Sequence, residues 1–258
     1  KLSMLIADLV KRKWPNVTIV CGGNHATFDV KNVLNNSSVD YVIRGEAELS
    51  FTEFVKVRMT DENPDGITGV ISRDKLQKNL YDETSPMLQD LNQLPLPAYD
   101  LLDMGVYRAE NRTSVMLSRG CVFKCTFCIN SIHKDPTVRL RSVDRVIAEI
   151  KYMLGVCKNI NTIFFEDEIF PVRGSFLKEF CEKYKKHINI PFQCILYPHM
   201  LSEEKLKMLK SAGLIEISMG LQSGSQRIRN DIYDRKDRNE IILKEKTLLS
   251  KYNVMMYY

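Results

Sequence analysis

Three cysteines lie within eight residues of one another, in the stretch Ser118-Arg-Gly-Cys121-Val-Phe-Lys-Cys125-Thr-Phe-Cys128. Their spacing, C-x3-C-x2-C, places three thiolates close enough together to hold one metal centre. A cube of four irons and four sulfides held by three cysteines keeps one iron without a protein ligand, and that iron is free to bind a small molecule. The spacing therefore predicts a 4Fe–4S cluster with an open coordination position.

Other uses of these cysteines explain the pattern less well. Disulfide pairing would leave a thiol over, because the chain has an odd total of seven cysteines, and nothing in the composition indicates an oxidising compartment. A structural zinc site needs a fourth ligand, which His133, five residues after Cys128, could supply. The other four cysteines are scattered singly, as is typical of small buried hydrophobic side chains: Cys21, Cys157, Cys181 and Cys194.

The composition is that of a soluble globular protein, with 258 residues of which 44% are apolar and 27% charged. This length suffices for one large domain or two small ones. No apolar run approaches the roughly 20 residues of a membrane helix. The net charge of +5 is mild and spread along the chain, which disfavours nucleic acid as a partner. We expect a cytoplasmic protein without a membrane partner. Because both ends fall inside expected elements, we also expect a fragment of a longer protein.

The first 60 residues alternate between helical and strand patterns. Apolar residues repeat at helical spacing over residues 2–12, a buried strand at 17–21 precedes Gly22-Gly23, and a short helix is expected at 30–36. A second buried strand at 40–43 ends before Gly45-Glu46, and a helix follows at 48–59. This order predicts half of a doubly wound parallel sheet, whose ligands bind beyond the carboxyl ends of the strands. Glycines there let backbone approach a ligand closely, although an isolated Gly-Gly pair is better explained as a tight turn.

From residue 113 onward, strands and helices alternate in a way that predicts a parallel sheet or barrel. Expected strands lie at 115–117, 162–165, 192–195, 215–218 and 254–258, with helices at 143–154, 174–186, after Ser202 and at 238–251. Catalytic groups of such barrels sit at the carboxyl ends of the strands. The cysteines follow the first strand, Glu166-Asp167-Glu168 the second, and Gln222-Ser223 the fourth.

The cysteine stretch, after an apolar strand and an Arg-Gly turn, resembles the signature of the radical S-adenosylmethionine (SAM) enzymes. The resemblance implies a partial six-stranded barrel in which SAM binds the open iron through its amino and carboxylate groups. An electron from the cluster then cleaves the sulfonium to give a 5′-deoxyadenosyl radical. It also implies that Phe127 packs near the adenine, or else covers the cluster, that Glu166 and Asp167 contact the SAM amino group, and that Gln222 and Ser223 reach the ribose or carboxylate.

The chain departs from this family's patterns at three strand ends. Glu168 stands where the family usually has a second Asp, and an acidic cluster at a helix start is an alternative explanation of this run. Gln222 replaces the usual Glu, so it can hydrogen-bond a hydroxyl but brings no charge. Tyr197-Pro198-His199 follows the third strand, where relatives often carry Arg.

The N-terminal motifs resemble the C-terminal half of the cobalamin-binding domain that precedes the barrel in one class of radical SAM enzymes. The resemblance rests on Gly22-Gly23-Asn24-His25 and Arg44-Gly45-Glu46, and it implies that Gly22, Gly23, Gly45 and Glu46 line the nucleotide-tail side of the corrinoid. A Leu-Pro-Leu-Pro-Ala-Tyr segment at 94–99 is similar to the one that joins the two domains.

These resemblances imply an α/β chain, in which the C-terminal half of a doubly wound cobalamin-binding sheet precedes a partial (β/α)6 radical SAM barrel, truncated at both ends. The expected domains are residues 1–60 for the cobalamin-binding half, 61–110 for a linker with a small β insertion, and 111–258 for the barrel without its last strand. The implied cofactors are a 4Fe–4S cluster, SAM and cobalamin.

The implied function is methylation or rearrangement at an unreactive carbon of a small-molecule or peptide substrate, with an electron donor such as flavodoxin or ferredoxin. The sequence does not choose between methyl transfer and cyclisation. One alternative is a methylthiotransferase acting on transfer RNA, which would need three more cysteines. Another is a cobalamin- or zinc-binding module without turnover.

Overall fold

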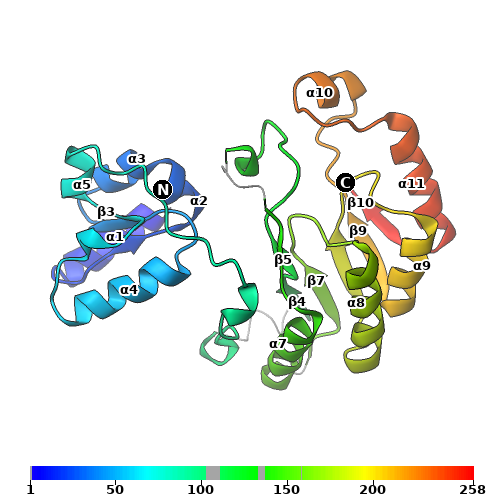
Figure 1. Cartoon of the computed structure of the whole chain (residues 1–258), viewed down its shortest axis with the longest axis horizontal. Helices are drawn as coiled ribbons and strands as arrows, with labels where there is room; N and C mark the ends of the chain where they lie inside the picture. Colours follow the sequence, from blue (N-terminus) through cyan, green and yellow to red (C-terminus); the bar gives the residue numbers. More distant parts are fainter. Residues whose placement is uncertain (1, 103–110, 133–136, 158) are drawn as a thin grey trace. The chain divides into compact units, whose positions relative to one another are not determined.

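The computed structural model describes residues 2–102, 111–132, 137–157 and 159–258, and the chain divides into two compact units between Gln89 and Asp90. Each unit builds its own hydrophobic core from strands and helices (Figure 1). The α/β fold class predicted from the sequence is therefore confirmed. None of the described helices is both long and apolar enough to cross a membrane.

The first unit is a three-stranded sheet in the order β1-β2-β3. β1 and β2 pair in parallel with Cys21 opposite Val42, whereas β3 pairs antiparallel to β2 with Ile71 opposite Val42. Its elements are α1 (Leu2–Lys13), β1 (Val20–Cys21), α2 (Gly23–Phe28), α3 (Val30–Asn35), β2 (Tyr41–Ile43), α4 (Glu48–Met59), the 3₁₀ turn η1 (Pro64–Gly66), β3 (Val70–Ser72) and α5 (Arg73–Gln77).

Apolar side chains project from both faces of this sheet, as expected of a doubly wound unit. Val42 and Ile71 pack with α1, α2 and α3 on one face, and Ile43 and Val70 pack with Phe54 of α4 on the other. All four strand residues are almost completely buried. This burial explains why the alternation of side chains along β2 and β3 fixes their register.

Two features of this unit differ from the sequence expectation. Gly23 begins the short helix α2, where a turn was expected. The segment around Val70, expected inside a linker insertion at 61–110, instead forms the third strand of the first unit, because Val70 and Ile71 are completely buried against β2. The boundary between the units accordingly falls at 89/90, whereas the sequence placed domain boundaries at 60 and 110.

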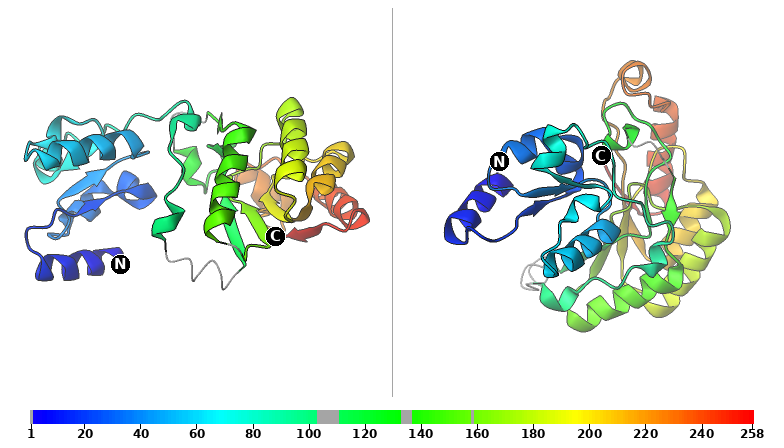
Figure 2. Two further views of the ribbon diagram at one scale, coloured as in Figure 1. Left: turned by 90° about the horizontal axis from the view of Figure 1, so that it is seen from below. Right: turned by 60° about the vertical axis from the view of Figure 1, so that its left-hand side comes forward.

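The second unit is built on five parallel strands in the order β10-β9-β8-β7-β4. Figure 2 shows the long helices on the outer face of this curved sheet. The strands are β4 (Arg112–Val115), β7 (Thr162–Phe165), β8 (Phe192–Ile195), β9 (Leu214–Ser218) and β10 (Met255–Tyr257). The helices are α7 (Val143–Val156), α8 (Gly174–His187), α9 (Glu203–Ala212), α10 (Gln226–Asp231) and α11 (Asn239–Lys251).

Smaller elements complete the second unit. β5 (Ser118–Arg119) and β6 (Arg139–Leu140) form a short antiparallel pair. Single 3₁₀ turns lie at η2 (Leu91–Gln93), η3 (Tyr99–Leu101) and η4 (Ile129–Ser131). The first strand of the sheet spans residues 112–115 and not the expected 115–117, since its backbone pairs with β7 from Arg112 opposite Thr162 to Val115 opposite Phe165.

Aromatic packing holds α8 on the sheet. The ring of Phe165 makes edge contacts with Phe170, Phe180, Tyr184 and Phe192, with centroids 5.3–5.8 Å apart. Such edge-to-face pairs add to the free energy gained by burying apolar area. Serine hydroxyls cap two of the helices, because Ser142 and Ser202 accept hydrogen bonds from backbone N–H groups in the first turns of α7 and α9.

Candidate functional site

The expected chemical residues gather at one edge of the five-stranded sheet. The neighbouring strands β4, β7, β8 and β9 are parallel, so their carboxyl ends lie at the same edge of the sheet. These ends are Val115, Phe165, Ile195 and Ser218. The segments that follow these ends carry the cysteines, the acidic run at 166–168, residues 196–199 and the turn at 219–223. Loops at this edge are where parallel α/β folds place their functional groups.

The loop between β5 and η4, which we name the cysteine loop (residues 120–128), brings the three predicted ligands into one short segment. All three are free thiols; Cys125 is buried, and Cys121 and Cys128 are half-buried. The backbone N–H of Cys128 donates to the Cys125 carbonyl at 2.9 Å and turns the loop back. Burial raises the pKa of the Cys121 and Cys125 thiols, and neighbouring thiols of the loop raise both further, whereas Arg235 lowers that of Cys125.

The donor chemistry of this loop fits a 4Fe–4S cluster, since it offers three cysteine sulfurs in one loop. In the described parts of the chain, no three Cys, His, Asp or Glu side chains are already gathered as a metal-binding group. The three thiols share one loop and lie close enough together that neighbouring thiols raise the pKa of Cys121 and Cys125. His133, the possible fourth ligand of a zinc site, lies outside the described residues.

Asp167 fixes the start of the cysteine segment. Its side chain is completely buried. One carboxylate oxygen accepts hydrogen bonds from the Ser118 hydroxyl at 2.5 Å and from the backbone N–H groups of Ser118 and Leu117 at 2.6 and 3.0 Å. The other oxygen accepts from the Leu117 N–H at 3.2 Å. Asp167 thus ties the end of β7 to the end of β4, a role that the sequence did not indicate.

The neighbours of Asp167 point outward. Glu166 and Glu168 are exposed, and the backbone N–H of Glu166 continues the sheet by donating to the Val115 carbonyl at 3.0 Å. Glu166 also lines a pocket of about 220 Å³ that reaches the Leu94–Pro97 segment. Of the two acids expected to meet the SAM amino group, Glu166 is the one whose carboxylate is accessible, and that contact remains a prediction.

The turn after β9 has an unusual backbone. Gln222 is exposed and adopts a φ of 64°, a left-handed conformation that non-glycine residues rarely take outside strained or functional sites. Gly220 makes room for its side chain, since a Cβ at Gly220 would lie 2.6 Å from the Gln222 Nε2. The Ser223 hydroxyl accepts a hydrogen bond from the Ser225 N–H at 3.1 Å. The two predicted contacts, Gln222 and Ser223, therefore lie together on this turn.

Aromatic and charged side chains surround the cysteine loop; the sequence pointed to Phe127 and to the Tyr197 segment, but not to the others. Phe123 stacks on Tyr197 with ring centroids 3.8 Å apart, and the Arg235 guanidinium lies 4.3 Å from the Tyr197 ring. Arg235 Nε donates to the buried Asp237 at 2.9 Å. Phe127 is half-exposed and meets the ring of Tyr233 in an edge contact at 5.1 Å, so part of its surface remains accessible. These contacts hold the cysteine loop in place.

In the first unit, the predicted glycines follow the carboxyl ends of the neighbouring strands β1 and β2. Gly23 has a φ of 85°, and a Cβ there would meet no atom within 4 Å, so the space beside it is open. Gly22 is extended, and a Cβ there would lie 3.7 Å from the Ile43 carbonyl oxygen. Gly45 has a φ of 82°, and its N–H donates to the Thr27 hydroxyl at 2.9 Å. Glu46 follows directly and is half-buried.

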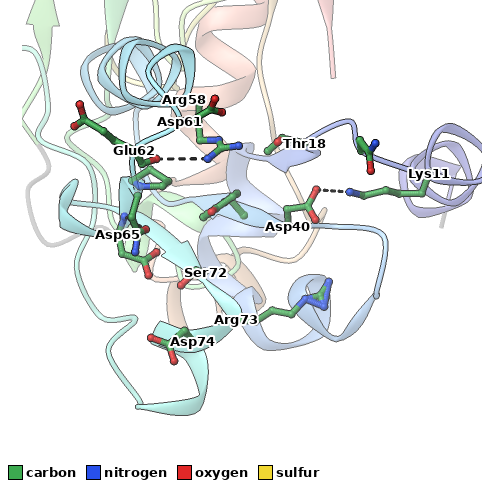
Figure 3. A pocket seen from close by; sticks show the side chains of 14 residues that line it. Lys11, Thr18, Asp40, Arg58, Asp61, Glu62, Asp65, Ser72, Arg73 and Asp74 are labelled. Carbon is green, nitrogen blue, oxygen red and sulfur yellow. Dashed lines mark hydrogen bonds and ion pairs between the residues drawn. The ribbon is translucent and has the colours of Figure 1, made fainter. Parts of the chain in front are cut away.

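A larger pocket of about 570 Å³ lies at the opposite edge of this sheet (Figure 3). Asp40, just before β2, accepts from the Ile19 N–H at 2.7 Å and pairs with Lys11 at 2.8 Å. Arg73 donates to the carbonyls of Asn36 and Val39. These charges hold α1 and the loop before β2 in place. The pocket contains none of the predicted cobalamin-binding glycines.

Comparison with known families agrees with this geometry. A family model described as the Radical SAM superfamily matches residues 115–254, more than half of the chain. The chain belongs to the radical SAM superfamily. A second model, described as a B12 binding domain, matches residues 3–55. The chain is therefore a member of the radical SAM class that carries a cobalamin-binding domain, and its cofactors are those of that class: a 4Fe–4S cluster, SAM and cobalamin.

Two individual proteins illustrate which sequences this chain resembles. PH0819 of Pyrococcus horikoshii, an uncharacterized methyltransferase, is 31% identical over 227 residues, which cover 86% of this chain and 49% of that protein. The anaerobic magnesium-protoporphyrin IX monomethyl ester cyclase of Cereibacter sphaeroides is 26% identical over 239 residues, covering 86% and 37%. The chain thus spans about half or less of the length of these relatives.

A solved structure shows the same fold. The cobalamin-dependent SAM radical enzyme OxsB with aqua-cobalamin bound superposes with a TM-score of 0.82, at 21% identity, over 99% of this chain and 38% of that one. The five-stranded parallel sheet and the three-stranded first unit are therefore the known radical SAM and cobalamin-domain architectures.

Within this radical SAM site, Gln222 is expected to contribute to SAM binding. Gln222→Ala removes one neutral hydrogen bond, which should cost about 0.5–1.5 kcal/mol and weaken SAM binding roughly threefold to tenfold. Gly220→Ala should act in the same direction, because its Cβ would displace the Gln222 amide. Titration of the reconstituted protein with SAM measures both effects, with iron content as the control. Unchanged SAM affinity in both variants would remove Gln222 from the site.

In the cobalamin-binding unit, Gly22 is a better position than Gly23 for testing whether cobalamin comes close to the backbone. Its extended backbone accepts a β-branched residue, whereas Val at Gly23 would strain a φ of 85°. In the full-length protein, Gly22→Val should cost about 1–3 kcal/mol of cobalamin binding, a loss of roughly fivefold to a hundredfold. Titration with hydroxocobalamin is the measurement. Gly66→Val, at an exposed glycine of the same unit with nothing nearby, is the matched control, and equal affinity of the two variants would contradict the assignment.

Proposed function

We propose that the full-length protein methylates an unreactive carbon of a small-molecule or peptide substrate by radical SAM chemistry with cobalamin. The observation that carries this proposal is the cysteine loop, with Cys121, Cys125 and Cys128 as free thiols at the carboxyl edge of a parallel sheet, in a chain whose first unit matches a B12 binding domain. The similarity to PH0819, called a methyltransferase, supports methyl transfer.

The chain's own residues have distinct parts in this proposal. The three cysteines would hold the cluster, Gln222 and Ser223 would hydrogen-bond SAM, and the accessible Glu166 carboxylate would attract its ammonium group. When bound, the cluster supplies the electron that cleaves SAM to a 5′-deoxyadenosyl radical, and cobalamin carries the methyl group. Buried Asp167 holds the start of the cysteine segment in place. A flavodoxin or ferredoxin would deliver the electron.

Cyclisation is the second candidate, because a cyclase is among the relatives. It differs from methyl transfer in what becomes of SAM. Both reactions release 5′-deoxyadenosine, but a methyl donor also leaves S-adenosylhomocysteine. The methylthiotransferase alternative is not favoured, since residues 3–55 match a cobalamin-binding domain.

The test uses the full-length protein, reconstituted anaerobically with iron, sulfide and hydroxocobalamin, then given SAM and dithionite. We expect reductant-dependent release of 5′-deoxyadenosine and formation of S-adenosylhomocysteine, both measured by mass spectrometry. Release of 5′-deoxyadenosine alone, with a substrate present, would favour cyclisation over methyl transfer. Failure to release 5′-deoxyadenosine from a protein that holds its cluster and SAM would contradict radical SAM activity altogether.

A further inference from the structure

The short helix α10 ends against the cysteine loop. Thr126, between Cys125 and Phe127, donates its hydroxyl to the Ile232 carbonyl at 2.6 Å and its backbone N–H to the Tyr233 carbonyl at 3.2 Å. These carbonyls directly follow α10, where the last carbonyls of a helix have no partner within the helix. Thr126 therefore caps α10 from the cysteine loop. The edge contact of Phe127 with Tyr233 reinforces the junction.

The other side of α10 holds the turn that carries Gln222. Arg229 is completely buried. Its guanidinium donates to the Ser223 carbonyl at 2.6 Å, to the Asp237 carbonyl at 3.2 Å and to the Asn239 side chain. A planar guanidinium binds several acceptors in a fixed arrangement, which a lysine cannot reproduce. Arg229 thus sets the distance between the Gln222–Ser223 turn and the segment after α10.

The segment after α10 returns to the cysteine loop a second time. Arg235 lies on the ring of Tyr197, which stacks on Phe123, and the Asp237 carboxylate holds Arg235 in place. The backbone N–H of Arg235 also donates to the Arg229 carbonyl at 2.8 Å. Phe123 and Thr126 therefore lie on either side of Cys125 in the sequence, and both are connected to the segment after α10. Phe123 is connected to it through Tyr197 and Arg235, and Thr126 through its own hydrogen bonds.

We propose that residues 226–239, which we name the α10 bracket, set the position of the Gln222–Ser223 turn relative to the cysteine loop (Figure 1 labels α10). Arg229 within this bracket, and Thr126, which binds the bracket from the cysteine loop, are positioning residues. The inference rests on the proposed function, in which the loop holds the cluster and the turn contacts SAM. SAM has to reach the open iron and the turn at once, so a change in their spacing weakens SAM binding without removing the cluster.

Thr126→Val is the sharpest test, because Thr126 is exposed and valine keeps its shape while removing the hydroxyl. In the anaerobically reconstituted full-length protein, we expect unchanged iron content and SAM binding weakened roughly threefold to tenfold, the loss of one hydrogen bond. The change that SAM causes in the electron paramagnetic resonance spectrum of the reduced cluster should need correspondingly more SAM. Thr126→Ser, which keeps the hydroxyl, should restore wild-type binding.

Two further variants complete the design. Arg229→Lys keeps the charge but loses the planar guanidinium that binds several acceptors at once. We expect it to weaken SAM binding by more than about tenfold with iron retained. If Arg229→Lys does not fold, the Thr126 pair decides. Thr247→Val is the matched control: Thr247 is also exposed and donates its hydroxyl to a backbone carbonyl, that of Leu243 at 3.0 Å, but within α11. It should bind SAM like the wild type.

The outcomes separate the bracket from the proposed function. Wild-type SAM affinity in Thr126→Val would overturn the bracket and leave radical SAM activity untouched. Loss of iron in Thr126→Val would also overturn it, because Thr126 would then serve cluster assembly and not spacing. If the wild-type protein itself holds iron but binds no SAM, the proposed function fails, and the bracket fails with it.

Discussion

Cys125→Ala is expected to abolish the iron–sulfur cluster. The wild-type chain, reconstituted anaerobically, should hold about four irons and show the brown colour of a 4Fe–4S cluster. Removing one of three thiolate ligands leaves two irons of the cube without a protein ligand, so the cluster should not survive desalting. Iron and sulfide analysis with visible absorption is the measurement. Cys125 is buried, but the change to alanine removes a single sulfur atom, so the fold should persist.

Cys181→Ala is the matched control for this result. Cys181 is also a buried free thiol, but it lies in α8, away from the cysteine loop. It should retain full iron, whereas Cys121→Ala and Cys128→Ala should behave like Cys125→Ala. Full iron and colour in Cys125→Ala would show that the cluster assignment is wrong. Circular dichroism of each variant before reconstitution checks that a loss of iron is not caused by unfolding.

The fold was largely predictable because its signals are local. Short apolar strands such as Thr162–Phe165 and Phe192–Ile195 alternate with helices whose caps, Ser142 and Ser202, stand immediately before them. The strand β3 falls within the small β insertion expected at 61–110, but no local signal assigns it to the first unit. That assignment depends on pairing with β2, roughly thirty residues earlier, where Ile71 lies opposite Val42.

Site residues could be predicted where their spacing alone indicates a chemical function. They could be predicted less well where the role of a residue depends on whether its side chain is buried. The cysteine spacing predicts three cluster ligands without any structure. In Glu166-Asp167-Glu168, three similar acids follow one strand, and only the structure shows that Asp167 turns inward while its neighbours stay exposed. Arg229 gave no signal either, because a buried arginine that binds carbonyls looks like any surface arginine in sequence.

Asp167→Ala should be strongly destabilising. The change leaves the backbone N–H groups of Leu117 and Ser118 without their acceptor in a buried place, where each unsatisfied donor is costly. We expect a loss of about 2–4 kcal/mol in the free energy of unfolding. Chemical denaturation of the apo chain measures it. Glu168→Ala, which removes an exposed carboxylate from the same run, is the matched control and should stay within about 0.5 kcal/mol of the wild type.

Asp167→Asn should reveal the titration of this carboxyl group. Burial raises the pKa of Asp167 from 3.8 to about 6, against the opposing effect of its hydrogen bonds. Because the folded pKa lies above the unfolded one, the folded chain holds the proton more tightly, and stability falls as the pH rises through this window. Between pH 4 and pH 7 the wild type should lose about 2 kcal/mol that Asp167→Asn does not lose. Denaturation curves at both pH values give this difference. A stability gap between the two proteins that stays constant with pH would contradict the raised pKa and show that the hydrogen bonds of Asp167 offset the effect of its burial.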